Sequence, residues 1–294
     1  MPGDGSGEKL LSRQTPIDRG LRRISGGFPY HEGGMRSEPE LVAAANQNYV
    51  GSYRKLVEHS ANGEIREQNG VFAFVTGLPI SLFNGCVVAA EATSAELDTA
   101  LDWVSARDLP YGVWIADEFA STLSDVPLAH GLEPDPMPYP GMVLHPRLEP
   151  PPSALAVTVV PVSGSGLDEY LGVLVEGGLP AALAQQLFSS SFARDPDVQL
   201  FLGRLDGRPV GTSIAIRTGD VSGVYAVGTL KAARRRGVGT ALTWAAVAAG
   251  RAWGSDTIVL QASEMGFPAY CAMGFRTVVW YATFSRPRPV VRVD

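Results

Sequence analysis

The chain has 294 residues, of which 45% are apolar and 18% are charged, and its formal net charge at pH 7 is −6. This apolar content excludes wholesale disorder, and the acidic balance argues against a general nucleic-acid binder, which needs an excess of basic groups on one face. No apolar stretch reaches the ~20 residues of a membrane helix, and the first residues lack the apolar region of a secretory signal. We therefore expect a globular cytoplasmic protein with no membrane or nucleic-acid partner.

The length favours two domains of about 120 to 150 residues each. The two cysteines, Cys86 and Cys271, fall one in each half and in otherwise apolar sequence, which predicts reduced, buried thiols rather than a disulfide. The four histidines are scattered and offer no close ligand pair, so no metal site is expected.

The first half is predicted to be a flexible tail followed by a mixed α/β domain. Residues 1–36 are rich in glycine and polar residues with no sustained period, whereas residues 37–146 alternate helical and strand-like apolar patterns. The expected elements are a helix at 39–59, strands at 71–76 and 80–90, a helix at 94–107, a strand at 111–116, a short helix ending at 130 and a strand at 141–145.

A proline-rich segment separates the two halves. Four prolines stand between residues 146 and 153, and such a run fits neither a helix interior nor a central strand. We therefore predict a linker at 147–153 and a second domain at 154–294. Its expected elements are a strand at 155–162, helices at 168–176 and 180–192, a hairpin of 198–204 and 210–217, a strand at 221–229, a helix at 235–253, a strand at 256–262, a short helix ending near 273 and a strand at 276–284.

The two halves have a similar order of elements, which indicates an internal duplication. Each has a strand, a long helix, a second strand, a short helix and then a glycine followed by an apolar residue, Gly131-Leu132 in the first half and Gly274-Phe275 in the second. The predicted fold class is therefore α/β, with an α+β mixed sheet. It is expected to form two tandem domains, each a mainly antiparallel sheet flanked by helices.

The strand-to-helix junction of the second half has the features of an anion site. It reads Arg234-Arg235-Arg236-Gly237-Val238-Gly239-Thr240, whereas the first half has Glu91 and no glycine at the same place. A helix N-terminus leaves backbone N–H groups unpaired and carries about half a positive charge, and glycines let an anion approach those groups closely. The flanking arginines add positive potential. Only the second junction is therefore expected to hold a phosphate.

These residues resemble the acyl-CoA motifs of the GCN5-related N-acetyltransferase (GNAT) family. The resemblance rests on Arg234-x-x-Gly237-x-Gly239 after the strand 224–227, followed by Tyr270-x-x-x-Gly274-Phe275. The first half resembles the degenerate N-terminal repeat of tandem members of this family. The resemblance implies direct transfer of an acetyl group from acetyl-CoA, as co-substrate and without a metal, to an amine of a small molecule or peptide.

The resemblance also assigns site residues. The backbone of residues 235–240 would hold the CoA pyrophosphate, the end of the strand at 227–229 would pair with the pantetheine arm, and Tyr270 would protonate the departing thiolate. Ser263 stands where the family often has asparagine, and Lys231 where it commonly has proline. The expected cofactor-binding residues are Val227, Gly228, Thr229, Arg234, Arg235, Arg236, Gly237, Val238, Gly239, Thr240 and Ser263, and the expected catalytic residue is Tyr270.

The sequence does not identify a general base, an acceptor or an oligomeric state. Four carboxylates are candidate bases, although each also fits a solvated surface group. They are Asp168, Glu169, Glu176 and Glu264. A protein that binds acyl-CoA without turnover, as a sensor or interaction protein, is the alternative, and the presence of Tyr270 beside the glycine-containing junction favours the enzyme.

Overall fold

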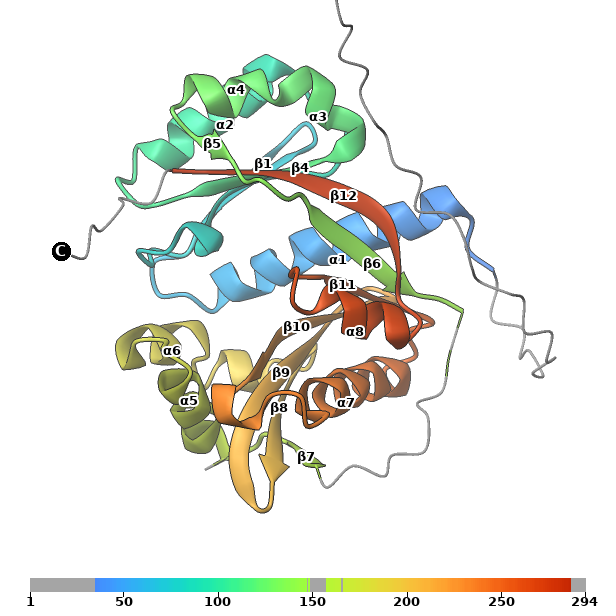
Figure 1. Ribbon diagram of the computed structural model, residues 1–294. Helices are drawn as coiled ribbons and strands as arrows, with labels where there is room; N and C mark the ends of the chain where they lie inside the picture. Colours follow the sequence, from blue (N-terminus) through green and yellow to red (C-terminus); the bar gives the residue numbers. More distant parts are fainter. Residues whose placement is uncertain (1–34, 147, 149–156, 165, 287–294) are drawn as a thin grey trace, which may run out of the picture. The chain divides into compact units, whose positions relative to one another are not determined.

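The computed structural model describes residues 35–146, 148, 157–164 and 166–286 (Figure 1). Apart from residues 35, 36 and 148, the predicted tail at 1–36 and the predicted linker at 147–153 lie outside the described residues. No helix in the described part of the chain is long and apolar enough to cross a membrane.

The helices and strands follow the predicted order closely. The first half contains α1 (Glu38–Glu58), β1 (Glu64–Gln68), β2 (Val71–Val75), η1 (Ser81–Phe83), β3 (Asn84–Val88), α2 (Ser94–Ser105), β4 (Gly112–Ala116), α3 (Asp117–Leu123), α4 (Asp125–Ala129), β5 (Glu133–Pro134) and β6 (Tyr139–Leu144). The second half contains β7 (Val157–Pro161), α5 (Gly166–Glu176), α6 (Ala181–Leu187), η2 (Phe192–Arg194), β8 (Val198–Leu205), β9 (Arg208–Thr218), β10 (Val221–Thr229), η3 (Lys231–Ala233), α7 (Val238–Ala252), β11 (Thr257–Gln261), α8 (Phe267–Ala272) and β12 (Arg276–Ser285).

Within the described residues, the twelve strands join one mixed sheet, which confirms the predicted α/β class with a mixed sheet. The strand order is β1-β2-β3-β4-β12-β6-β11-β10-β9-β8-β7, with β5 pairing β12 beside this path. Strands β3 and β4 are parallel, as are β10 and β11, and the other pairings are antiparallel. The last strand of each half pairs with the other half, since β12 pairs β4 and β6 pairs β11. The sheet is therefore continuous from one half to the other.

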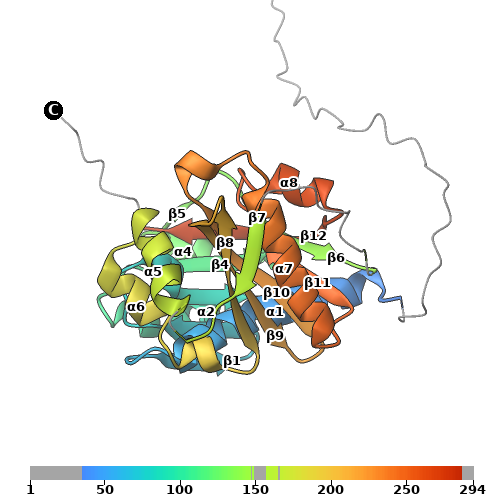
Figure 2. The same cartoon turned by 90° about the horizontal axis from the view of Figure 1, so that it is seen from below.

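Helices α1 and α7 cover opposite faces of the strands of the second half. Successive side chains of a strand point to opposite faces. In β10, a Cβ atom on Gly223 would lie 2.0 Å from Oδ1 of Asn48 in α1, whereas a Cβ atom on Gly250 of α7 would lie 2.7 Å from Cβ of Ser222. Glycine at 223 and 250 therefore lets both helices pack tightly on the sheet. Helices α5 and α7 similarly flank β8 and β9, as the view from below shows (Figure 2).

Helix α1 belongs to the first half but forms buried hydrogen bonds with strands of the second half. Asn48 is fully buried, and its Nδ2 donates to the carbonyl of Ile216 at 3.1 Å while its Oδ1 accepts from the hydroxyl of Tyr225 at 2.6 Å. Because both polar ends of the amide are paired, its burial does not cost the free energy of an unmade hydrogen bond.

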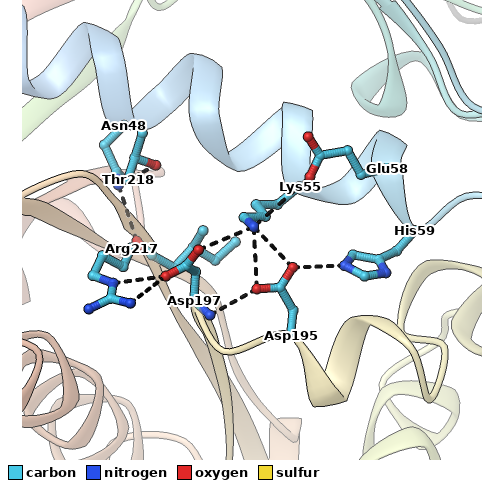
Figure 3. A network of polar contacts seen from close by, with 9 residues as sticks. Asn48, Lys55, Glu58, His59, Asp195, Asp197, Arg217 and Thr218 are labelled. Atoms are coloured by element: carbon cyan, nitrogen blue, oxygen red, sulfur yellow. Dashed lines mark hydrogen bonds and ion pairs between the residues drawn. The ribbon is translucent and has the colours of Figure 1, made fainter.

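The end of α1 adds an ionic network to these contacts (Figure 3). Lys55 lies 3.0 Å from Asp195 and 3.3 Å from Asp197, and His59 Nε2 lies 2.9 Å from Asp195. Asp197 also pairs with Arg217 at 2.6 Å. Charges of α1 are thus balanced by charges that the second half supplies.

Several local expectations were wrong. The helix predicted from residue 235 begins at Val238, because Arg235 and Gly237 have left-handed backbone angles, with φ of 63° and 78°. The single strand predicted at 80–90 is divided into η1 and β3, and the strand β1 was not predicted. β1 is polar and mostly exposed, so it lacks the apolar alternation that marks a strand.

The prediction of two buried cysteines is only half correct. Cys86 is buried in β3, and burial raises the pKa of its thiol. Cys271 is exposed, because α8 is short and presents this residue to solvent.

Candidate functional site

The parallel strands β10 and β11 begin side by side and then separate. Their pairing runs from Val221 to Gly223 of β10 and stops there, although β10 continues to Thr229. An irregularity in the pairing of β10 with β9 lies between Tyr225 and Gly228, where Ala226 has a positive φ of 47°. A bulge of this kind bends its strand. The end of β10 therefore has one edge paired with β9 and the other edge free of β11.

The free edge leads into the junction at residues 234–240, which we name the cradle. Helix α7 begins at Val238, and no side chain caps it. The first backbone N–H groups of a helix have no partner within the helix, and the helix dipole makes this end positive. The cradle therefore presents unpaired donors at the end of β10, which is the arrangement that binds phosphate groups in proteins.

The start of α7 would accept a side chain at position 239 without a clash. A Cβ atom placed on Gly239 would have Thr229 at 3.8 Å and Val227 at 4.0 Å as its nearest neighbours. Glycine is thus not needed here for packing, since a Cβ atom would make only ordinary van der Waals contacts with the strand end. The arrangement fits the requirement for close approach of an anion to backbone amides.

The three arginines of the cradle are exposed. The Nε of Arg234 donates to the carbonyl of Thr229 at 3.3 Å, which ties the cradle to the end of β10. Arg236 lies 3.2 Å from Asp206 in an exposed ion pair, and exposed pairs of this kind are weak. Both cations remain accessible to an anion in solution.

Tyr270 lies on α8 and is connected to the cradle through α7. Burial raises the pKa of Tyr270, and the nearby hydroxyl of Thr243 in α7 opposes that effect in part. The hydroxyl of Thr243 in turn donates to the carbonyl of Gly239 at 2.9 Å. The phenol is therefore held close to the first turn of α7, and its hydroxyl is protonated at neutral pH.

A cavity of about 330 Å³ lies between the divergent strand ends, and we name it the central cavity. Val227, Ser263 and Tyr270, all predicted from the sequence, line it together. Other parts of its wall come from α1, η1 and β6 of the first half, with Tyr53, Phe83 and Tyr139 among them. The volume is at the lower end of the range for small-molecule sites. The cavity therefore lies at the divergence of β10 and β11, beside the strand end that continues to the cradle.

Ser263 lines the cavity and also forms a hydrogen bond within its own loop. Its hydroxyl accepts a hydrogen bond from the amide of Gly266 at 3.2 Å, at the start of α8. This contact orders the loop that leads into α8, the helix that carries Tyr270.

The sequence missed residues that line the cavity from other elements. Tyr225 precedes the bulge, and Gln261 ends β11 with a buried amide nitrogen that has no hydrogen-bond partner within the described residues. A tyrosine and a glutamine at strand ends are individually common, so no local pattern distinguished them. These two residues line the cavity because β10 and β11, which carry them, diverge there.

The four candidate bases do not line this cavity. Glu169 pairs with Arg204, and Glu176 pairs with Arg208 at 2.7 Å on the outer surface. Neither Asp168 nor Glu264 is among the described residues that form the cavity wall.

Comparisons with known proteins agree with this geometry. Residues 178–266 match a family model described as an acetyltransferase (GNAT) domain, a region that includes the cradle and ends before Tyr270. A comparison with curated proteins finds no match.

Solved structures of similar fold cover most of the chain. A GCN5-related N-acetyltransferase from Kribbella flavida is 21% identical with a TM-score of 0.60, and the match covers 84% of this chain and 97% of that one. A GCN5-related N-acetyltransferase from Sphaerobacter thermophilus is 17% identical with a TM-score of 0.53, and the match covers 87% of this chain and 95% of that one. Residues 178–266 are therefore similar to a GNAT acetyltransferase domain, and the chain shares the fold of these two proteins over most of its length.

Proposed function

We propose that this protein is an N-acetyltransferase that transfers an acetyl group from acetyl-CoA to an amine of an acceptor. The observation that carries the proposal is the separation of β10 from β11 beside the uncapped start of α7. The free strand edge, the row of unpaired amides and the cavity beyond them match the three parts of acetyl-CoA, which are its amide-containing arm, its pyrophosphate and its thioester. A cytoplasmic location, where acetyl-CoA is available, accords with this activity.

The residues of the cradle and of the β10 end would hold the co-substrate. Backbone N–H groups of residues 235–240 would bind the pyrophosphate, with Arg234, Arg235 and Arg236 adding positive charge. The free edge of β10 at Val227, Gly228 and Thr229 would pair with the pantetheine amides, as an added strand pairs with a sheet edge. Ser263 would contact the arm from the opposite side of the opening.

The chemistry requires one bond to form and one to break. The acceptor nitrogen forms a C–N bond to the acetyl carbonyl carbon, the C–S bond to CoA breaks, the nitrogen loses one proton and the sulfur gains one. A backbone N–H near the bulge of β10 would stabilise negative charge on the carbonyl oxygen. Tyr270 would donate the proton to sulfur, and its raised pKa keeps the donor protonated at neutral pH.

We also propose that the first half, residues 37–146, is a degenerate GNAT-like repeat joined by the linker at 147–153 to an acetyl-CoA-binding domain at 154–294. In support, each half has a parallel pair of strands connected by a helix, α2 between β3 and β4 and α7 between β10 and β11, and each sends its last strand into the sheet of the other half. This exchange relates the two halves as equivalent units.

The proposal is tested by calorimetry with acetyl-CoA, followed by measurement of thiol release across a panel of amines. We expect binding with one acetyl-CoA per chain, because α2 at the first junction is capped by a side chain and α7 at the second is not, and we expect thiol release that depends on an acceptor. Binding of two acetyl-CoA molecules per chain would contradict the assignment of the site. Binding without thiol release on any amine would favour the non-catalytic alternative.

A further inference from the structure

We infer that the acceptor is an uncharged aromatic amine, an arylamine, whose ring occupies the central cavity. This inference rests on the proposed function. It names the substrate class from the chemistry of the cavity wall, which aromatic side chains of both halves form.

Among the described residues, aromatic rings from six elements and one connecting segment line the central cavity. They come from α1 (Tyr49, Tyr53), η1 (Phe83), β6 (Tyr139), η2 (Phe192), β10 (Tyr225), α8 (Tyr270) and the segment after α6 (Phe188). Aromatic rings pack against one another in offset and edge-to-face arrangements that add to the free energy of apolar burial. A flat aromatic ligand would extend this packing.

The cavity wall lacks ionised groups. No lysine, arginine, histidine, aspartate or glutamate is among the described residues that line it. Lys55 of α1, which precedes the lining residue Leu56 in the chain, is already paired, since it lies beside both Asp195 and Asp197 (Figure 3). An ammonium or a carboxylate on the acceptor would therefore be desolvated without a counter-charge, which is costly.

The lack of ionised side chains in the cavity wall also affects the protonation state of the acceptor amine. Only the neutral form of an amine has the lone pair that attacks a thioester, and burial without a carboxylate partner favours the neutral form. An arylamine is already neutral at physiological pH and needs no base to remove a proton before it reacts. The absence of a carboxylate or histidine from the described wall then carries no penalty for this class of acceptor.

The central cavity adjoins a hollow of about 490 Å³, and two exposed side chains line both spaces, Leu82 at 46% and Tyr139 at 37% exposure; we name their boundary the entrance. Glu133, Asp135 and Arg286 line the hollow but not the cavity, so the lack of ionised groups applies to the cavity alone. The chain offers a matched control for Leu82, because Leu128 is 45% exposed and lines neither space.

The first test compares kcat/KM values for thiol release with 4-methylaniline, 1,4-diaminobutane, an aminoglycoside and a lysine-containing peptide. We expect the arylamine value to exceed each of the others by at least about tenfold, because the others must bring unpaired charge into the cavity. A higher kcat/KM for any of the other three acceptors than for 4-methylaniline would overturn the inference while leaving the proposed acetyltransferase activity intact.

The second test changes the entrance. Leu82→Glu places a carboxylate at the entrance, in place of an apolar side chain, and should lower kcat/KM for 4-methylaniline by roughly tenfold, whereas Leu128→Glu should leave it unchanged. Equal effects of the two variants would overturn the inference.

A third measurement needs no turnover. The unreactive probe 4-fluorobenzyl alcohol, followed by fluorine NMR, should broaden with the wild-type protein and with Leu128→Glu but much less with Leu82→Trp, which narrows the entrance. If the probe binds in this way and no amine supports thiol release, the proposed function fails while the aromatic site stands. If the probe does not bind, the inference fails.

Discussion

The two strand-to-helix junctions of this protein have the same order of elements and different chemistry. At the first junction, β3 pairs with β4 to its last residue, Val88, and Thr93 caps α2. The hydroxyl of Thr93 accepts from the amide of Glu96 at 3.3 Å, and the Glu96 carboxylate accepts from the amide of Thr93 at 2.7 Å. These two side chains satisfy donors that α7 leaves free.

The second junction lacks both the continuous strand pairing and the capping side chain of the first. β10 leaves β11 after Gly223, and α7 begins without a capping side chain. We therefore expect binding capacity at such a junction to depend on which backbone groups are left unpaired. A continuous ladder and a capped helix satisfy these groups within the protein, whereas a separated ladder and an uncapped helix leave them for the proposed ligand.

The largest expected effect comes from closing the open junction. Gly239→Glu places a carboxylate at the second position of α7, where it would occupy the place of the anion, and we expect acetyl-CoA binding to be lost in calorimetry. Ala95→Glu makes the same change at the second position of α2 and is the control, which should bind normally. The assignment of the cradle would be wrong if a folded Gly239→Glu protein kept wild-type affinity.

Removing the proton donor should act on turnover alone. Tyr270→Phe keeps the ring in the cavity wall but deletes the hydroxyl, so we expect kcat to fall by roughly 10²–10⁴-fold with acetyl-CoA affinity nearly unchanged. Cys271→Ser alters the exposed neighbour of Tyr270 and should leave kcat unchanged. A wild-type kcat for Tyr270→Phe would remove this residue from the mechanism.

The contact between the halves should show in the pH dependence of stability. Burial alone would raise the pKa of Asp195, but hydrogen bonds from His59, the amide of Asp197 and Lys55 outweigh it and hold the pKa below its usual value. A depressed pKa in the folded state stabilises the protein above the unfolded-state pKa, and this stabilisation is lost as the pH falls through the folded-state value.

Asp195→Asn should therefore lower the free energy of unfolding by about 2 kcal/mol at pH 7, with a smaller difference from wild type at strongly acidic pH. Urea unfolding at several pH values measures this. Asp220→Asn is the control, because Asp220 forms an exposed pair with Arg36 and should contribute less than about 1 kcal/mol. A loss that stays constant down to strongly acidic pH would show that the charge of Asp195 is not responsible.

The smallest expected effect sharpens the contrast between capped and uncapped helices. Thr93→Ala removes the cap of α2 and should lower the free energy of unfolding by about 1 kcal/mol. Thr240→Ala, in the first turn of α7, should leave stability unchanged or slightly higher, because alanine favours a helix and no cap is lost. Equal losses in thermal unfolding would mean that Thr240 has a capping role after all.

The sequence alone predicted the order of elements and the position of the cradle. β10 has the predicted bounds, and α2 begins at the predicted Ser94, because apolar spacing and capping residues act over a few neighbouring positions. The glycines of the cradle were informative for the same local reason, since Gly237 adopts the left-handed backbone that glycine favours.

Tertiary structure decided what lies opposite the cradle. The hydrogen bond between Asn48 and Tyr225 joins residues 177 positions apart, and the exchange of β6 and β12 brings Tyr139 to a cavity that Tyr270 also lines. The exposure of Cys271 and the aromatic wall likewise depend on which distant elements pack together. Local patterns carry no information about such pairings, because the free energy that selects them comes from burial of surfaces that meet only in the folded chain.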